Sequence, residues 1–317
     1  MLIQDITCHH VYNYGATLQA FALQHYMESL GCQYEIVDYR LCSHHRYELF
    51  FLPPQGKCYK VSRYIPFSRY ILGYYKNRKQ LKTWGRKMAF DRFDKKYLHI
   101  TPKTFRSIEE LKSANFHPDI LIAGSDQIWN TEYENGHDKA YFLDFVDENV
   151  KKNSYAASFG VDHIDETSKQ FVKNELLNFD LISVREKSGI NILNDLGIYG
   201  AEQVIDPVFL LPKSEWSSLA TGGKDYHLLK DKYILVYDFM GDERVKQLAQ
   251  KIKGKDRSLK IVSINDATEL SYADVNINNA GPLEFLKLVE SSHVVVCSSF
   301  HATAFSIILM NIRNHPN

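Results

Sequence analysis

Five short segments of the sequence carry polar or ionisable side chains directly after apolar runs: residues 13–15, 124–130, 158–160, 185–188 and 298–301. In open parallel sheets, ligands bind beyond the carboxyl ends of the strands, where helix N-termini present unpaired N–H groups. We therefore expect the five segments to share a ligand site. The candidate binding residues are Asn13, Gly15, Gly124, Ser125, Asp126, Gln127, Trp129, Asn130, Ser158, Gly160, Ser298 and Ser299.

Arg185 and His301 are the candidate catalytic residues. A guanidinium is always charged and holds a phosphate or carboxylate through two hydrogen bonds, although the adjacent Glu186 offers it an ion pair instead. His301 follows an apolar run and begins a helical one, a position from which an imidazole contacts an anion or exchanges a proton near neutral pH. The hydroxyls of Ser298 and Ser299 either cap this helix or hold phosphate oxygens.

Residues 124–130 allow two interpretations. In one, they cap the start of a helix and Trp129 lies in the core. In the other, they bind a sugar, because hydroxyls pair with amides and carboxylates while a sugar ring stacks on an aromatic side chain. Gly15 is expected to provide positive φ in the first strand-to-helix turn, although the pattern GxGxxG is absent.

Several other kinds of site lack their motifs. The sequence has no HExxH, P-loop or GxSxG pattern. Four histidines occur in pairs without a matching carboxylate or Cys pattern, so we interpret them as incidental and expect no metal and no resident cofactor. These histidines are His9, His10, His44 and His45.

Composition limits the class of protein and its compartment. Lys and Arg total 38, as do Asp and Glu, so the overall charge does not predict a nucleic-acid partner. The five cysteines include no CxxC pair, which argues against a disulfide framework or structural zinc and favours a reducing compartment. No apolar run reaches 18 residues and the first ten residues do not resemble a signal peptide. We expect a cytoplasmic protein.

The order of apolar runs predicts the fold. A chain of 317 residues, 44% of them hydrophobic, is expected to form two globular domains. Runs typical of strands alternate with helical runs, which is the pattern of doubly wound α/β domains with parallel sheets. We predict two Rossmann-like domains facing across a cleft, over residues 1–212 and 232–317, with a linker at 213–231. The predicted strands are 2–8, 34–39, 119–123, 153–158, 181–184, 203–205, 233–237, 259–264 and 293–297.

Residues 57–96 depart from this alternation. They contain 13 Lys or Arg against two Asp, interleaved with aromatic residues. We predict a helical insertion in the first domain. Its basic side chains either form a solvated face or contact an anionic membrane surface or a diphosphate-lipid acceptor.

Six phrases along the chain together resemble one family, the polysaccharide pyruvyl transferases. They are NYGATLQAFALQHYMESLG (13–31), AGSDQIWN (123–130), YAASFG (155–160), SVREKSG (183–189), VIDPVFLL (204–211) and SSFHATAFSI (298–307). The resemblance implies a GT-B-like pair of domains that transfers pyruvate from phosphoenolpyruvate to two hydroxyls of a sugar, forming a ketal. It also implies capsule or exopolysaccharide synthesis on a sugar acceptor that is often lipid-linked. The membrane contact considered for residues 57–96 would then be peripheral, at the inner membrane.

The resemblance also implies roles for residues. Arg185 matches the family's anion-binding arginine, and His301 matches the histidine near the substrate phosphate, a candidate acid or base. In better-studied members an Arg-Leu pair precedes this histidine, whereas Ser299 and Phe300 precede it here. Relatives continue past the equivalent of residue 317, so we expect an incomplete second domain.

Two other functions fit the residues. A GT-B glycosyltransferase using a nucleotide sugar would hold a diphosphate with Arg185 or His301 and a ribose with Glu269 or Asp242. Alternatively, the chain is a non-catalytic subunit that binds a glycan or a partner enzyme.

Overall fold

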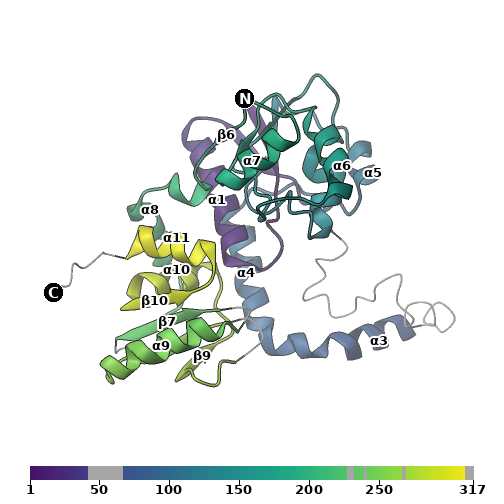
Figure 1. The fold of residues 1–317 in the computed structure, drawn as a ribbon. Helices are drawn as coiled ribbons and strands as arrows, with labels where there is room; N and C mark the ends of the chain where they lie inside the picture. The colour runs from purple at the N-terminus through teal and green to yellow at the C-terminus, as the bar shows by residue number, and fades with distance from the viewer. Residues whose placement is uncertain (42–66, 227–231, 239–240, 266–268, 311–317) are drawn as a thin grey trace. The chain divides into compact units, whose positions relative to one another are not determined.

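The computed structural model describes residues 1–41, 67–226, 232–238, 241–265 and 269–310 (Figure 1). The chain divides into two compact units. Unit 1 consists of Met1–His44 and Asp94–Leu211, and unit 2 consists of His45–Phe93 and Pro212–Asn317.

The sheet of unit 1 is parallel, in the order β2-β1-β3-β4. Its strands are β1 (Leu2–Ile6), β2 (Gln33–Ile36), β3 (Ile120–Ala123) and β4 (Lys151–Ser154). Bridges between Asn153 and Leu181 and between Ala157 and Val184 lead to β5 (Ser183–Val184), which pairs with β6 (Glu202–Gln203). Because β1 lies between β2 and β3, the winding changes direction there, and ligands bind at such switch points.

Helices and short 3-10 turns surround this sheet. Asn13, Ser107 and Asp165 lie at the helix N-caps, and their side chains accept from backbone N–H groups of the first turn. The helices are α1 (Tyr14–Ser29), α5 (Ile108–Ser113), α6 (Glu166–Leu176) and α7 (Lys187–Asp195), and the 3-10 turns are η2 (Glu134–His137), η3 (Lys139–Phe142) and η4 (Pro207–Phe209).

Unit 2 contains a second parallel sheet, in the order β10-β7-β8-β9. Its strands are β7 (Tyr233–Tyr237), β8 (Lys260–Ile264), β9 (Val275–Ile277) and β10 (Val294–Cys297). The winding direction changes between β7 and β10. The second switch point therefore lies where β10 leads into α11 (Phe300–Leu309).

Helices cover both faces of this second sheet (Figure 1). On one face, Val245 and Ala249 of α9 (Glu243–Lys255) pack with the apolar strand residues. On the other, ring contacts run from Tyr237 to Phe285 of α10 (Pro282–Ser291), then to Phe305 of α11, then to Trp216 of α8 (Lys213–Ala220). The segment predicted as a linker thus begins with a helix, while residues 227–231 lie outside the described part.

The basic insertion is largely helical from residue 68 onward, and residues 57–66 lie outside the described part. It forms α3 (Ser68–Asn77), η1 (Arg78–Thr83) and α4 (Trp84–Tyr97). The insertion is predicted to belong to the first domain, but its residues up to Phe93 group with unit 2. The buried Arg86 donates to the carbonyl of Ala280 at 3.3 Å, and Gly85 and Ala89 lie against Asn279 and Gly281, so α4 packs on the segment before α10.

The predicted α/β class with parallel sheets is confirmed. Strand β9 and helices α5 and α8 were not predicted. Within the described residues, Cys8, Cys32 and Cys297 are free thiols. None of the described helices has the length and apolarity that crossing a membrane requires.

Candidate functional site

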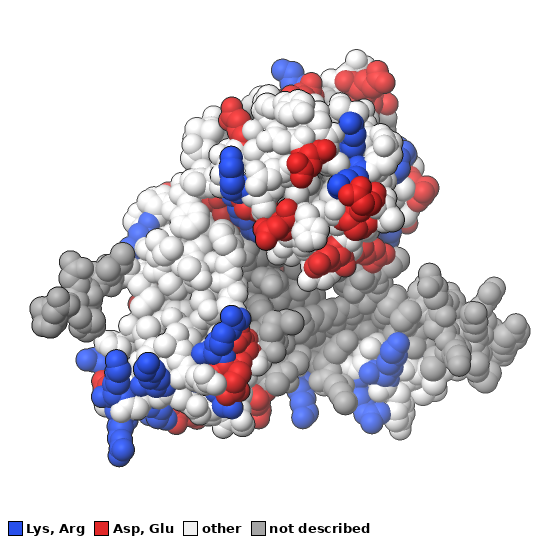
Figure 2. Space-filling model, viewed as in Figure 1, with Lys and Arg blue, Asp and Glu red and all other residues white. Residues whose placement is uncertain are grey.

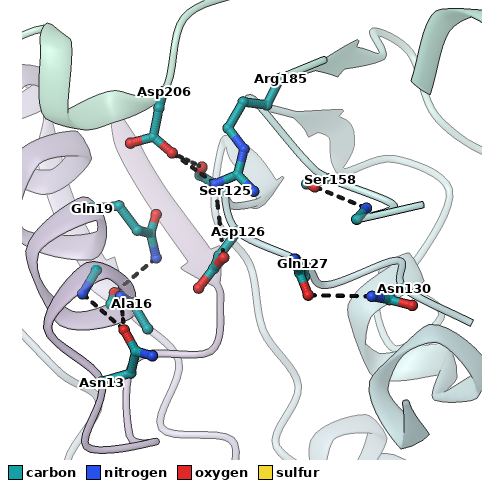
Figure 3. Close-up of polar contacts among 12 residues, drawn as sticks. Asn13, Ala16, Gln19, Ser125, Asp126, Gln127, Asn130, Ser158, Arg185 and Asp206 are labelled. Atoms are coloured by element: carbon teal, nitrogen blue, oxygen red, sulfur yellow. Dashed lines mark hydrogen bonds and ion pairs between the residues drawn. The ribbon is translucent and has the colours of Figure 1, made fainter. Parts of the chain in front are cut away.

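The start of α1 borders the switch point of unit 1. The side-chain oxygen of Asn13 accepts from the N–H groups of Gly15 at 2.9 Å and Ala16 at 3.4 Å (Figure 3). Asn13 is thus a helix cap, and its half-buried amide borders the carboxyl end of β1. Gly15 is the second residue of the helix rather than a turn residue with positive φ, which corrects the expectation for this glycine.

Buried hydrogen bonds join the loops that follow β1 and β3. Gln19 of α1 donates to the Thr7 hydroxyl at 2.9 Å, and this hydroxyl donates to the carbonyl of Ser125 at 3.0 Å. The Ser125 hydroxyl in turn donates to Asp206 at 3.3 Å. All four side chains are almost inaccessible to solvent, so their hydrogen bonds hold these loops in fixed positions.

Arg185 lies near three carboxylates, two of which, Asp126 and Asp206, are labelled in Figure 3. Its Nη1 lies 2.9 Å from Asp206 Oδ2 and 3.7 Å from Asp126 Oδ1, and its Nε lies 3.6 Å from Glu186 Oε2. Burial would lower the pKa of Arg185, but the charges of Asp126 and Asp206 raise it above its ordinary value. The guanidinium therefore stays charged and fastens the loops that follow β3, β5 and β6.

Glu186 and Gly160 shape the edge beside Arg185. Glu186 Oε1 accepts from the Ser158 hydroxyl at 2.8 Å and from the N–H of Phe159 at 3.0 Å. Gly160 has a φ of +67°, and a Cβ added to it would lie 2.7 Å from the side-chain nitrogen of Asn130. The loops carrying residues 124–130 and 158–160 are thus in close contact.

This contact predicts a measurable difference between two glycine substitutions. Gly200 has a φ of +86° with open space around it, so Gly200→Ala adds only backbone strain, about 1 kcal/mol. Gly160→Ala adds the same strain and also pushes Asn130 and Gln127, so we expect a loss of about 2 kcal/mol. Urea unfolding of both variants measures the difference. Equal losses would mean that Asn130 and Gln127 move freely.

Trp129 lies in the core. Its ring is fully buried, stacks on Phe142 at 5.9 Å between centroids and donates from Nε1 to the Tyr141 carbonyl at 3.0 Å. It has no exposed face on which a sugar could stack, which corrects that expectation. Among residues 124–130 only Asp126 and Gln127 have side chains that reach solvent.

Gly124 allows a strand carboxylate to lie against the loop. A Cβ added to Gly124 would lie 2.2 Å from Asp5 Oδ1. Asp5 belongs to β1 and is fully buried. Because even one methyl group would overlap this carboxyl group, residue 124 has no room for a side chain.

The switch point of unit 2 carries the other predicted residues. Ser299 lies at the N-cap of α11 and accepts through its carbonyl from the Thr303 N–H at 3.1 Å. His301 is in the first turn, 8% exposed, with its ring centroid 5.1 Å from that of Phe300. Ser298 is exposed just before the cap. Because Arg185 belongs to unit 1 and His301 to unit 2, their meeting at one ligand stays a prediction.

A family comparison bears on the whole set of segments. The family model described as Polysaccharide pyruvyl transferase matches residues 13–309. The chain belongs to the polysaccharide pyruvyl transferase family. All five candidate segments fall inside this match, and family membership makes the protein a transferase.

No curated protein sequence matches. Among solved structures, the chain is similar to Spinosyn Forosaminyltransferase SpnP, with 9% identity and a TM-score of 0.41 over 96% of this chain and 77% of that one.

The chain also contains a His–Asp pair, His9 and Asp38, that was not predicted from the sequence. His9 Nε2 lies 3.3 Å from Asp38 Oδ1, and Asp38 also accepts from Arg40 at 2.7 Å and from Thr104 at 2.6 Å. Burial opposes ionisation of Asp38, but these donors hold its pKa well below the ordinary value. The only sequence signal was the position of Asp38 at the end of a predicted strand.

The structure describes the first histidine pair but not the second. His10 Nδ1 lies 3.7 Å from Asp94 Oδ2, so this histidine also has a carboxylate neighbour. His9 and His10 thus each have a carboxylate neighbour that the sequence pattern did not reveal, whereas His44 and His45 lie outside the described residues. Across the described ranges, no three His, Cys, Asp or Glu side chains are placed to hold a metal ion.

The cavity of unit 1 and the Asp242 of the nucleotide-sugar alternative complete the description of the site. A cavity of about 780 Å³ in unit 1 is lined by Met27, Leu30, Leu176 and Tyr199, among others, and by none of the candidate residues. Asp242, a ribose contact in the nucleotide-sugar alternative, caps α9 and pairs with Arg244 at 2.6 Å.

Proposed function

We propose that this protein transfers pyruvate from phosphoenolpyruvate to two hydroxyls of one sugar in a capsular or exopolysaccharide precursor. The observation that carries the proposal is the family match over residues 13–309. The location of Arg185, Ser158 and residues 124–130 beyond the carboxyl ends of parallel strands also supports it, because such ends bind anionic and polar ligands.

The reaction balances without a redox partner. One acceptor hydroxyl bonds to C2 of the donor while C3 gains a proton and becomes a methyl group. The second hydroxyl then bonds to C2 as the C2–O bond to phosphate breaks. Of the two hydroxyl protons, one is accounted for by the methyl group and the other by the released hydrogen phosphate. No resident cofactor is needed in this scheme.

Arg185 would bind the anionic donor. Asp206 is buried and also accepts from Ser125 and from the Val208 N–H, so it stays in place. Asp126 and Glu186 are partly exposed and lie farther from the guanidinium, at 3.7 and 3.6 Å. Asp126 would therefore move aside when a phosphate or carboxylate approaches, since like charges repel, whereas Glu186 is also held by Ser158 and the Phe159 N–H.

The other roles follow from position. His301, in the first turn of α11, would contact the phosphate and transfer a proton. Asp126 and Gln127 would contact acceptor hydroxyls. The acceptor would be a lipid-linked oligosaccharide at the cytoplasmic side of the inner membrane.

The direct test incubates the enzyme with phosphoenolpyruvate and a panel of galactose- and mannose-containing acceptors, including lipid-linked ones. We expect phosphate release together with the mass gain of one pyruvate ketal per acceptor. Parallel reactions contain nucleotide sugars instead. Transfer of a sugar in those reactions, without ketal formation from phosphoenolpyruvate, would contradict the proposal.

His301→Gln is expected to lower kcat about 100-fold, the lower range for loss of a positioned acid or base. His117→Gln removes an exposed histidine of unit 1 and serves as the matched control, with activity expected to be unchanged. Wild-type turnover in a well-folded His301→Gln variant would remove this histidine from the mechanism.

A further inference from the structure

Helix α3 exposes a continuous apolar face. Residues spaced three and four apart share one face of a helix, and here these residues are aromatic or aliphatic. Their side chains are 41% to 78% exposed, which is unusual for residues of this type. We call this surface the α3 face; it consists of Phe67, Tyr70, Ile71, Tyr74 and Tyr75.

The charges around the α3 face have a single sign. The sequence has no Asp or Glu from residue 49 to residue 90, whereas residues 67–90 include seven Lys or Arg. Helical spacing places Arg69 and Lys76 opposite the α3 face. Where Figure 1 draws α3, the part of the surface that is not grey in Figure 2 shows blue and white without red.

Not every basic residue of the insertion belongs to this surface. Arg86 is buried over the ring of Phe90 and donates to Ala280, so it serves the packing of unit 2. Lys87 pairs with Asp91. In contrast, the guanidinium of Arg78 lies 4.9 Å above the Tyr75 ring, at the border of the α3 face.

An anionic lipid surface fits this arrangement best. Tyrosine is favoured at the membrane–water interface because its ring is apolar and its hydroxyl is polar. Ile71 has neither a polar group that could pair with a base nor a ring on which a base could stack, so it favours lipid over nucleic acid. Positive charges within a Debye length of an anionic surface add attraction, and no acidic neighbour in the segment opposes it.

We propose that α3 lies in the plane of an anionic bilayer surface, with the α3 face in the headgroup region, and so holds the enzyme at the membrane. This binding is independent of the chemical step. It would place the catalytic units beside lipid-linked acceptors, but it needs neither donor nor acceptor. The proposal and the proposed function therefore fail or succeed separately.

Vesicle sedimentation of the full chain tests the proposal. We expect at least tenfold more protein to sediment with phosphatidylcholine vesicles containing 30% phosphatidylglycerol than with pure phosphatidylcholine in low salt. High salt should reduce this excess. The double substitution Ile71→Gln, Tyr75→Gln should abolish sedimentation, and Arg69→Gln, Lys76→Gln should weaken it.

Leu248→Gln on α9 is the matched control, because Leu248 is also exposed, at 49%. It should sediment like the wild type. A Tyr75→Trp variant adds a signal that does not depend on loss of binding: its fluorescence should shift to shorter wavelength with anionic vesicles and be quenched by brominated lipids.

Three results would overturn the proposal. The first is equal sedimentation with neutral and anionic vesicles in low salt. The second is wild-type binding by the Ile71→Gln, Tyr75→Gln variant. The third is a dimer in light scattering that this double substitution dissociates, which would make the α3 face an interface between copies of the chain.

Discussion

Replacing Arg185 by Gln is expected to lower the rate of ketal formation about 100- to 1,000-fold, the range seen when one preorganised charged or polar donor is removed from an anionic reacting group. The KM for phosphoenolpyruvate should rise as well, because the guanidinium contacts the donor before the reaction. Steady-state kinetics with phosphate release as the readout measures both quantities.

The same substitution should also weaken the fold. Asp206 is fully buried and its Oδ2 lies 2.9 Å from the Arg185 guanidinium. Gln cannot supply the positive charge, so a carboxylate stays buried without its cation, which destabilises by about 3 kcal/mol. Reduced activity of Arg185→Gln alone would thus have two explanations.

A paired substitution separates them. Asp206→Asn removes the buried charge while its side-chain oxygen can still accept from the Val208 N–H. In the variant Arg185→Met, Asp206→Asn, we expect most of the free energy of unfolding that Arg185→Gln loses to be restored. Turnover should stay at the level of Arg185→Gln. Recovery of turnover in the pair would show that Arg185 only fastens loops and does not bind the donor.

Asp5→Asn is expected to stabilise the protein at neutral pH by about 4 kcal/mol. Burial in the sheet raises the pKa of Asp5 from 3.8 to about 7, although Tyr34 and the Gly124 N–H lower it slightly. A shift of this size corresponds to about 1.4 kcal/mol per pH unit between the two values.

The sign of the effect follows from proton binding. Below about pH 4 both the folded and the unfolded chain keep the proton, so Asp5 has no pH-dependent effect. Between about pH 4 and 7 the unfolded chain loses the proton first, and the free energy of unfolding falls as pH rises. Above about pH 7 both states are ionised and the loss is constant. The advantage of Asp5→Asn should therefore grow over this window and then level off.

Asp38→Asn is the matched control with the opposite sign. Hydrogen bonds from His9, Arg40 and Thr104 lower the pKa of Asp38, so its stabilising contribution is present at neutral pH and is lost in acid. Asp38→Asn should destabilise at pH 7, with a difference that shrinks below the ordinary pKa. Urea unfolding from about pH 2.5 to pH 8 measures both variants. A pH-independent difference for Asp5→Asn would contradict the buried, protonated carboxyl group.

Local patterns predicted most of the fold because the strands are short apolar runs followed by polar loops. Strand β9, Val275–Ile277, was missed because it has three residues with only Ile277 fully buried. Helix α8 was missed because its sequence is mostly polar, and only Trp216 and Ala220 are buried. The grouping of residues up to Phe93 with unit 2 depends on a contact to Ala280, which no local pattern reveals.

The sequence predicted which loops carry the candidate site residues, but not which side chains contact one another there. Spacing placed Arg185 after a strand, yet its principal partner, Asp206, comes from another loop and looked only like the end of a strand. Trp129 illustrates a different difficulty. A tryptophan after a strand can point to solvent or to the core, and only the surrounding rings of Phe142, Phe159 and Phe179 decide it.

The contact between Asp5 and Gly124 also constrains the order in which substitutions accumulate among descendants of this sequence. A side chain at position 124 overlaps the carboxyl group at position 5, so Gly124→Ala is harmful while Asp5 is present. A smaller residue at position 5 removes the obstacle beforehand. Alanine at both positions is therefore accessible along one mutational route and blocked along the other.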